Sequence, residues 1–362
     1  MAAMLRTWDV FCRVIDNHGD LGVAWRLAAD LARRGERVRL WVDDAAALAW
    51  MAPHGDAGVQ LVAWTKEAPP DLEPADVVVE CFGCDPPPRF VQRMAARNSP
   101  PAWINLEYLS AEAYVDRSHG LPSPVTVAPG RTLVKRFHFP GFTAASGGLL
   151  REPGLIDAAR AFDRDRWLQA RGLAARPGER IVSLFCYTNA ALPALLDVLA
   201  AEPTLLLVTP GAAATQVEAA LGAVRRRGGL RAILLPYLTQ QDYDRLLWAC
   251  DLNFVRGEDS FVRAQWAAKP FVWQAYPQPD AVRLAKVRAF LDRFLAGTAP
   301  AFRDALARLW RGWNGDATAP LAPTALLPDS SNWRRRCEAW RDELAAQPDL
   351  ASQLIRDAFR AS

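Results

Sequence analysis

Residues 8–42, WDVFCRVIDNHGDLGVAWRLAADLARRGERVRLWV, decide the fold of the first part of the chain. The short apolar and β-branched run at 8–15 predicts a strand, and the run at 37–42 predicts another. Between them, residues 21–34 have the apolar spacing of a helix, and residues 16–22 form a loop before it. The stretch is therefore a β-α-β unit, which is typical of a parallel sheet.

The same alternation of strands and helices continues along the chain. Further strands are predicted at 59–64, 77–82 and 103–106, with Pro- and Gly-rich connections around 85–88 and 120–130. A second series starts with RIVSLFCY at 180–187 and runs to the strand at 270–275. Two doubly wound sheets in tandem are therefore expected, each binding ligands at the carboxyl ends of its strands.

These patterns predict an α/β chain with two Rossmann-like, doubly wound domains that face a cleft. The first domain is expected at 1–160 and the second at 175–330, joined by an Arg-, Gly- and Pro-rich linker within 151–178. Residues 331–362 are expected to form an amphipathic helical tail, which could pack back on the first domain.

The composition is that of an ordinary globular protein. Hydrophobic residues make up 51% and charged residues 23% of the 362 residues, and the net charge is only +3. We therefore expect no nucleic-acid partner and no membrane partner. The amino terminus lacks a signal peptide, no apolar stretch reaches 18 residues, and six scattered cysteines indicate buried thiols, so a cytoplasmic location is predicted.

The loop at 16–22 carries two carboxylates, Asp16 and Asp20, and lacks the G-x-G-x-x-G pattern of a dinucleotide-binding turn. Two negative charges at the start of a helix would repel a phosphate, so this loop should not bind one. The pair suits a group that accepts a proton or binds a cation. Helix capping by Asp20 and a turn role for Asp16 explain the same residues equally well.

A second loop, at 256–260, has the opposite character. Gly257 permits close backbone approach, and the amides of Glu258, Asp259 and Ser260 are expected at a helix amino end, where they could bind a diphosphate. Arg256 and Ser260 add side-chain donors. Simple capping of the following helix by Glu258, Asp259 or Ser260 is the structural alternative.

Both loops resemble those of one known family. The segment FCRVIDNHGDLGVAWRLAADLARRG at 11–35 is similar to the opening of the elongation factor P arginine rhamnosyltransferases, with their Asp-Asn-x-Gly-Asp-(Ile/Leu)-Gly-Val loop. The segment DLNFVRGEDSFVRAQWAAKPFVWQAYPQ at 251–278 resembles the family's Arg-Gly-Glu-Asp-Ser segment and the Lys-Pro-Phe-x-Trp-Gln-x-Tyr-Pro-Gln that follows it. The resemblance extends from the first strand to the strand at 270–275.

The resemblance implies a GT-B glycosyltransferase that transfers L-rhamnose, with inversion, from dTDP-β-L-rhamnose to an arginine of elongation factor P. It implies that Asp20 is the general base, that Asp16 supports the acceptor, and that Glu258 and Asp259 are needed for activity. No metal and no cofactor are expected. The residues implied to bind the donor are Asn17, Gly19, Phe185, Tyr187, Tyr237, Gln240, Tyr243, Arg256, Gly257, Glu258, Asp259, Ser260 and Tyr276.

Two alternatives remain open from the sequence. The same scaffold could carry another nucleotide-sugar enzyme, either an epimerase or a glycosyltransferase for small molecules. The chain could also be a nucleotide-sugar-binding regulator of translation without turnover.

Weaker motifs favour structural roles. Cys81 and Cys84 have metal-ligand spacing but no second pair, which argues against a metal site. Asp163 and Asp165 match an Asp-x-Asp motif but lie in an Arg-rich helical stretch. The histidines at 54, 119 and 138 show no partners in sequence that suggest a catalytic triad.

Overall fold

The structure, a computed structural model, describes residues 6–15, 18–64, 72–322, 327 and 330–360. It divides into two compact units. Unit 1 comprises Met1–Pro153 together with Ala345–Ser362, and unit 2 comprises Gly154–Leu344. Within the residues that the structure describes, none of the helices has the length and apolar character needed to cross a membrane.

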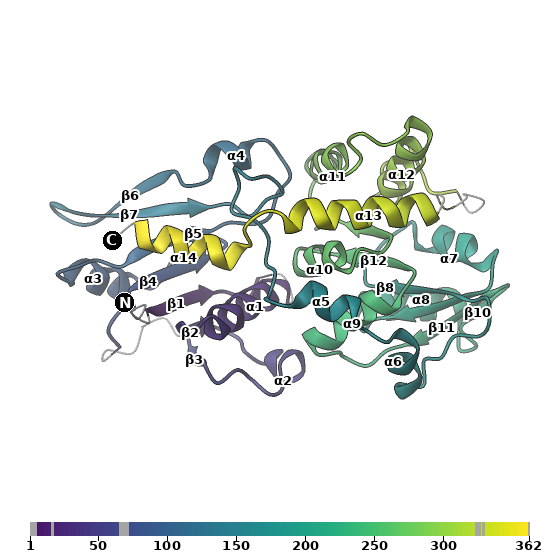
Figure 1. The fold of residues 1–362 in the computed structure, drawn as a ribbon, viewed down its shortest axis with the longest axis horizontal. Helices are drawn as coiled ribbons and strands as arrows, with labels where there is room; N and C mark the ends of the chain where they lie inside the picture. The colour runs from purple at the N-terminus through teal and green to yellow at the C-terminus, as the bar shows by residue number, and fades with distance from the viewer. Residues whose placement is uncertain (1–5, 16–17, 65–71, 323–326, 328–329, 361–362) are drawn as a thin grey trace. The chain divides into compact units, whose positions relative to one another are not determined.

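Unit 1 is built on a mostly parallel sheet with the strand order β3-β2-β1-β4-β5-β7-β6 (Figure 1). Every neighbouring pair is parallel except β6 and β7. The order reverses between β1 and β4, so the carboxyl ends of these two strands form the switch point of the sheet. The strands are β1 (Thr7–Cys12), β2 (Arg37–Val42), β3 (Val59–Ala63), β4 (Val77–Cys81), β5 (Ala102–Leu106), β6 (Pro122–Ala128) and β7 (Arg131–His138).

The helices of unit 1 cover the central strands, which are buried on both faces. The helix α1 is the most buried of them, because its apolar residues recur at helical spacing and pack on β1, β2 and β4. A second core on the other face contains residues of β1, β4 and α3. The helices are α1 (Gly19–Arg33), α2 (Leu48–Met51), α3 (Pro88–Ala96), α4 (Tyr114–Ser118) and α14 (Leu350–Arg360).

The carboxyl-terminal helix α14 completes the core of unit 1. Leu350, Leu354 and Ala358 are fully or almost fully buried in the same cluster as α1. The carboxylate of Asp349 accepts the backbone N–H of Ser352 at 2.9 Å and forms a 2.9 Å ion pair with Arg34 of unit 1. The last helix therefore belongs to the same folding unit as the first.

Unit 2 has a second parallel sheet with the strand order β10-β11-β9-β8-β12-β13, in which only β10 and β11 pair antiparallel. Its order reverses between β8 and β12, which places a second switch point at the carboxyl ends of these strands. The strands are β8 (Arg180–Leu184), β9 (Thr204–Val208), β10 (Arg226–Arg227), β11 (Leu230–Leu234), β12 (Leu252–Arg256) and β13 (Phe271–Gln274).

The helices of unit 2 flank this sheet and begin with two helices from the segment after Pro153. A buried aromatic cluster, including Phe271, Phe290 and Trp310, packs α11 and α12 on β13. The helices are α5 (Leu155–Arg160), α6 (Arg164–Ala170), α7 (Leu192–Ala200), α8 (Ala212–Leu221), α9 (Gln240–Ala249), α10 (Asp259–Ala267), α11 (Asp280–Phe294), α12 (Pro300–Trp313) and α13 (Ser330–Ala345).

Three details differ from the sequence-based predictions. The segment around 120–130 is not only a connection, because β6 and β7 form a hairpin there; its prolines are tolerated since β6 is an edge strand. The segment at 151–178 contains α5 and α6, and α5 packs on α10. The tail is two helices, α13 and α14, because Pro348 interrupts the helical pattern between them.

Candidate functional site

Asp20 lies at the carboxyl edge of the sheet of unit 1, in the first turn of α1. Its side chain is only 4% exposed. One carboxylate oxygen, Oδ2, accepts the backbone N–H of Ile15 at 3.3 Å, and the other, Oδ1, lies 3.4 Å from the hydroxyl of Tyr108. The N-cap position belongs to His18, so the capping interpretation of Asp20 is wrong.

The surroundings of Asp20 come from the loops after three strands. Tyr108 follows β5, and its ring stacks on Phe82, which follows β4, with 4.3 Å between ring centroids. Burial is the main cause that raises the pKa of the Cys12 thiol at the end of β1, and the charge of Asp20 raises it further. A buried carboxylate thus lies at the switch point beside exposed aromatic surface.

Two of the predicted residues, Asp16 and Asn17, lie outside the residues that the structure describes. Gly19 is the first residue of α1. The structure therefore locates one carboxylate of the predicted pair.

The second candidate site lies at the switch point of unit 2, where Phe185 and Tyr187 follow β8 and Arg256 ends β12. The guanidinium carbon of Arg256 lies 4.4 Å from the ring centroid of Phe185 and 4.1 Å from that of Tyr187. In the described part of the chain, no carboxylate forms an ion pair with Arg256, and its buried Nε has no hydrogen-bond partner. This cation is held by aromatic rings, which leaves its charge available for an anion.

The loop after Arg256 is fixed in a tight conformation. Gly257 has φ +65°, and a β-carbon there would lie 3.1 Å from the Tyr187 hydroxyl. The indole of Trp273 donates to the Gly257 carbonyl at 2.7 Å. The Ser260 hydroxyl accepts the Arg256 backbone N–H at 3.1 Å and donates to the Arg256 carbonyl, so its proton is used inside the loop.

Glu258 and Asp259 begin α10. Glu258 occupies the N-cap position, but its side chain makes no capping hydrogen bond, and Asp259 is the first helical residue. The side-chain capping expected as the structural alternative is therefore not seen for Glu258. The backbone amides of this first turn point toward the amino end of the helix, which favours an anion.

More aromatic residues extend the site around Arg256. Tyr243 packs edge-on against Phe185 at 5.8 Å, and Tyr276 packs edge-on against Tyr187 at 5.6 Å. Burial raises the pKa of Tyr243. Tyr276 and Tyr237 are 45% and 58% exposed, and Gln240 begins α9, one turn before Tyr243.

Two buried or partly buried amides that were not predicted from the sequence hold the aromatic loop. Gln274 accepts the Tyr187 N–H at 2.9 Å, and Gln216 donates to the Tyr187 carbonyl at 3.2 Å. Gln274 ends β13, beside β12, so its place at the carboxyl edge could have identified it. Gln216 lies inside α8, where no sequence signal marks it.

The weaker motifs have structural roles. Cys81 and Cys84 are buried, and burial raises the pKa of both thiols, that of Cys84 to about 12, so both are protonated at neutral pH. Asp163 caps α6 by accepting the backbone N–H of Arg166 at 3.0 Å.

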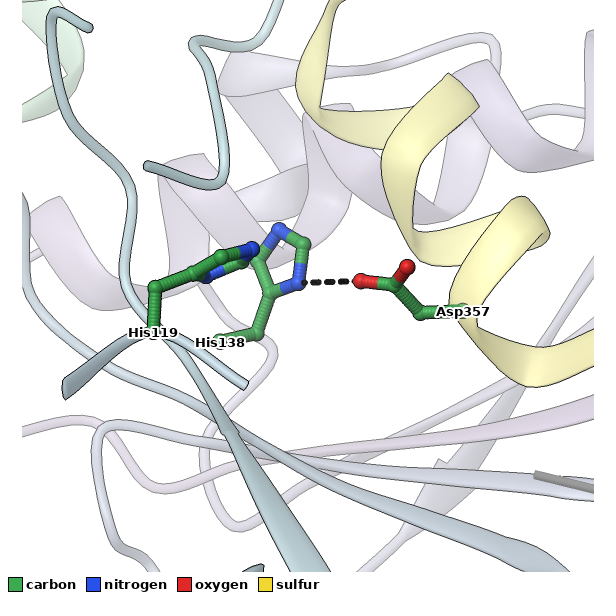
Figure 2. A group of neighbouring side chains, drawn as sticks. All are labelled: His119, His138 and Asp357. Atoms are coloured by element: carbon green, nitrogen blue, oxygen red, sulfur yellow. Dashed lines mark ion pairs between the residues drawn. The ribbon is translucent and has the colours of Figure 1, made fainter. Parts of the chain in front are cut away.

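A group of three titratable residues, His119, His138 and Asp357, lies in unit 1 (Figure 2). His138 is 2% exposed; its Nε2 lies 3.2 Å from the Gly147 carbonyl, and its Nδ1 lies 3.4 Å from Asp357 Oδ2. Nothing in the sequence indicates that these residues lie together, but the ring centroids of His119 and His138 are 4.7 Å apart.

The hydrogen bonds of this group disfavour a metal ion. His119 Nδ1 accepts the backbone N–H of Phe139 at 3.2 Å, so neutral His119 carries its proton on Nε2 and has no lone pair left for a metal. Only His138 and Asp357 remain as ligands, which is fewer than the three protein ligands of a typical catalytic zinc site. We therefore assign no metal to the group.

Two cavities lie at the amino ends of strands, each at the sheet edge opposite the candidate site of its own unit. One, of about 610 Å³, is lined by Thr7, Arg39 and Asp76 of unit 1 among others, and the other, of about 530 Å³, by Arg180 and Asp251 of unit 2. Charged groups of both cavities are paired within the protein, Arg39 with Asp9 and Asp251 with Arg164. Neither cavity offers the chemistry found at the carboxyl edges.

The comparisons with known proteins agree with one another. Residues 8–358 match the family described as Elongation-Factor P (EF-P) rhamnosyltransferase EarP. A protein-arginine rhamnosyltransferase of Pseudomonas aeruginosa is 43% identical over 375 residues, covering 97% of this chain and 98% of the relative. One of Neisseria meningitidis is 36% identical over 378 residues, covering 95% of each chain.

A solved structure described as "Structural basis for EarP-mediated arginine glycosylation of translation elongation factor EF-P" covers 99% of both chains, with a TM-score of 0.70 and 34% identity. The fold, with two doubly wound units, is that of the GT-B glycosyltransferases.

Proposed function

Because the chain belongs to the EarP family of elongation factor P rhamnosyltransferases, it is a glycosyltransferase of the protein-arginine type, and we propose that it transfers L-rhamnose from dTDP-β-L-rhamnose to an arginine of elongation factor P. Since that acceptor is a translation factor, we propose that the enzyme acts in the cytoplasm.

The donor assignment rests on the surroundings of the Arg256 guanidinium. Its guanidinium is held between the rings of Phe185 and Tyr187, and no carboxylate of the described residues neutralises it. A diphosphate would supply the missing negative charge and would lie at the amino end of α10, where backbone amides add further donors. As the sugar leaves, this environment would stabilise the charge that develops on the dTDP oxygen. We propose that these groups act in place of a metal ion.

The aromatic residues around Arg256 support a pyrimidine nucleotide. Phe185, Tyr187, Tyr243 and Tyr276 are linked by edge contacts and by the Arg256 contact, and they provide flat apolar faces for a thymine ring. Gln240 begins α9 one turn before Tyr243 and could orient the base through its amide. Tyr237 and Tyr276 offer exposed ring surface for the rest of the nucleotide.

The carboxylate of Asp20 supports the acceptor assignment. A guanidinium is protonated at all ordinary pH values and its nitrogen lone pairs are delocalised, so it attacks poorly without help. A carboxylate that binds two of its N–H groups would fix its orientation and accept a proton as the new bond forms. Asp20 is buried and held by Ile15, and so can present one fixed carboxylate to such a cation.

The proposed reaction is a single displacement. An arginine nitrogen forms a bond to the anomeric carbon of rhamnose, and the bond from that carbon to the diphosphate oxygen breaks. The nitrogen loses its proton to Asp20, and dTDP leaves with the electron pair. Attack on the face opposite the leaving group converts the β-linked donor into an α-linked product. We propose that Asp16 supports the acceptor and that Glu258 and Asp259 contribute to activity, as the family resemblance implies.

A purified-component assay tests this proposal. The full chain is incubated with dTDP-rhamnose and elongation factor P, and intact-mass spectrometry measures the acceptor. We expect the mass to increase by one deoxyhexose, with release of one dTDP for each modification, also in the presence of EDTA. An unmodified acceptor with conversion of the nucleotide sugar would instead indicate an epimerase or a transferase for small molecules.

The base assignment needs a separate variant. Asp20→Asn keeps the size of the side chain and one acceptor oxygen but cannot accept the proton, so we expect kcat to fall by a factor on the order of 100 to 10,000. Unchanged dTDP binding would show that the donor site remains intact. Full activity of Asp20→Asn would exclude Asp20 as the base.

A further inference from the structure

One aromatic ring lies beside Asp20 and a second ring stacks on the first, and neither has a part in the proposed donor site. The hydroxyl of Tyr108 lies 3.4 Å from Asp20 Oδ1, and the rings of Tyr108 and Phe82 stack with centroids 4.3 Å apart and planes 14° apart. Tyr108 is 43% exposed, whereas Asp20 is 4% exposed. An exposed aromatic ring therefore lies next to the buried carboxylate.

The backbone of Phe82 is in an unusual conformation. Its φ is +61°, the next residue Gly83 has φ +65°, and the Cys84 N–H donates to the Cys81 carbonyl at 3.3 Å. Two successive left-handed residues make a turn in which asparagine and glycine are favoured and a bulky aromatic residue is disfavoured. Such conformations gather at functional sites, where the surrounding structure maintains them.

The position of the Phe82 ring is set by the sheet. The backbone N–H of Phe82 donates to the Leu106 carbonyl at 2.6 Å, which continues the pairing of β4 with β5 beyond the last strand residues. This bond aligns the loop after β4 with the loop after β5, and so places Phe82 under the ring of Tyr108. The sheet thus holds a disfavoured side chain where it supports Tyr108.

We propose that Phe82 and Tyr108 form an acceptor platform, on which the guanidinium of the substrate arginine stacks while its N–H groups bind Asp20. This inference rests on the proposed function, in which arginine is the acceptor and Asp20 is the base. A guanidinium is planar and weakly hydrated, so it gains from stacking on an aromatic face and binds a carboxylate with two parallel hydrogen bonds.

The platform explains a preference for arginine over lysine. A lysine ammonium is compact and strongly hydrated and has no plane to stack, so it would gain less from the exposed ring of Tyr108. The Tyr108 hydroxyl also has a positioning role. The Ile15 backbone N–H donates to Oδ2 of Asp20, and the Tyr108 hydroxyl donates to Oδ1. Both oxygens of the carboxylate are therefore fixed by hydrogen bonds before the substrate binds.

Three variants of the full chain separate these roles. Tyr108→Ala removes the ring and the hydroxyl, Tyr108→Phe removes only the hydroxyl, and Phe82→Asn removes the supporting ring but suits the left-handed backbone. For each variant, kcat and the KM values for elongation factor P and for dTDP-rhamnose are measured. Tyr114→Phe, which alters another exposed tyrosine of unit 1, serves as the matched control.

We expect Tyr108→Ala and Phe82→Asn to raise the KM for the acceptor on the order of tenfold and to leave the KM for the donor unchanged. Tyr108→Phe should keep the acceptor KM but move the acid limb of the kcat profile to higher pH, because the Asp20 carboxylate loses a hydrogen-bond donor. Tyr114→Phe should match the wild type in all of these measurements.

The outcomes distinguish this inference from the proposed function. If the wild type does not modify elongation factor P, the proposed function fails, and the platform fails with it. If the wild type is active and Asp20→Asn is inactive, but Tyr108→Ala and Phe82→Asn keep the acceptor KM of the wild type, only the platform is excluded. Equal increases in both KM values with a lower melting temperature would show a structural role and would also overturn the inference.

Discussion

The guanidinium of Arg263 and the carboxylate of Asp244 form two parallel hydrogen bonds, Nε to Oδ1 and Nη2 to Oδ2, each 2.8 Å long. Their side chains are 2% and 7% exposed. Asp244 follows Tyr243 in α9, and Arg263 lies one turn after Ser260 in α10. The pair therefore joins α9, which carries residues proposed to bind the thymine ring, to α10, which begins at the proposed diphosphate site.

Arg263→Met should strongly destabilise unit 2. It leaves the carboxylate of Asp244 buried without the Arg263 guanidinium, which costs about 3–5 kcal/mol of unfolding free energy in comparable pairs. The double variant Arg263→Met with Asp244→Leu leaves no buried charge and should recover much of this loss. Urea unfolding of the full chain measures both variants. A double variant less stable than the single one would contradict this explanation.

Gly257→Ala should weaken donor binding. Alanine disfavours φ +65°, and its β-carbon would lie 3.1 Å from the Tyr187 hydroxyl, so Tyr187 or the loop must move. Gly172→Ala is the matched control, since Gly172 also has φ +65° but has nothing within 4 Å of the added carbon. Both variants should lose about 1–2 kcal/mol of stability. Only Gly257→Ala should lower the affinity for dTDP in calorimetry, and equal affinities in the two variants would refute the steric argument.

Much of the fold and of both candidate sites could be predicted from local patterns. Arg256 ends β12, Asp20 lies in the first turn of the helix after β1, and the carboxyl ends of parallel strands lie at one edge of a sheet. The alternation of strand and helix patterns therefore gave both the sheets and the place of their functional loops. The hairpin β6–β7 was missed because its prolines indicate turns unless the strand is known to be at an edge.

Long-range partners could not be predicted in this way. Tyr108 is far from Asp20 in sequence, and only the order β1-β4-β5 brings the two loops together. His138 and Asp357 meet because α14 returns to unit 1, which no local pattern shows. Single residues such as Phe82 carry no sequence signal of left-handed backbone, since bulky aromatic residues rarely adopt it.

Replacement of Arg256 should reduce the affinity for dTDP, and the size of the loss should depend on the residue that replaces it. Arg256→Gln removes the charge and should weaken binding on the order of 10- to 100-fold, the usual range for a lost charged hydrogen bond. Arg256→Lys keeps the charge but loses the planar contact with Phe185 and Tyr187, so a smaller loss is expected. Arg303→Gln, an exposed arginine of α12, controls for net charge. Calorimetry with dTDP measures all three, and wild-type affinity of Arg256→Gln would exclude this diphosphate contact.

The environment of His119 predicts a loss of stability in mild acid. Burial lowers the pKa of His119 to about 4, and the nearby His138 and Arg356 lower it further, while Asp357 and Asp116 oppose the shift. The physical cause is also visible in the hydrogen bonding, because a protonated His119 could no longer accept the backbone N–H that Nδ1 now receives.

The direction of the pH effect on stability follows from the protonation of His119 in the folded and in the unfolded chain. Between pH 6.5 and about 4 the unfolded chain binds a proton at His119 that the folded chain does not, so this contribution to stability is complete above pH 6.5 and decreases as the pH falls toward 4. Since the ring is partly exposed, we expect a loss of about 1–2 kcal/mol. His119→Gln can accept the same N–H without titrating and should flatten the dependence, whereas the exposed His54→Gln should not. Urea unfolding of the wild type and both variants from pH 7 to pH 5 measures the dependence of the unfolding free energy on pH. If the wild type and His119→Gln show the same dependence, His119 does not contribute to it.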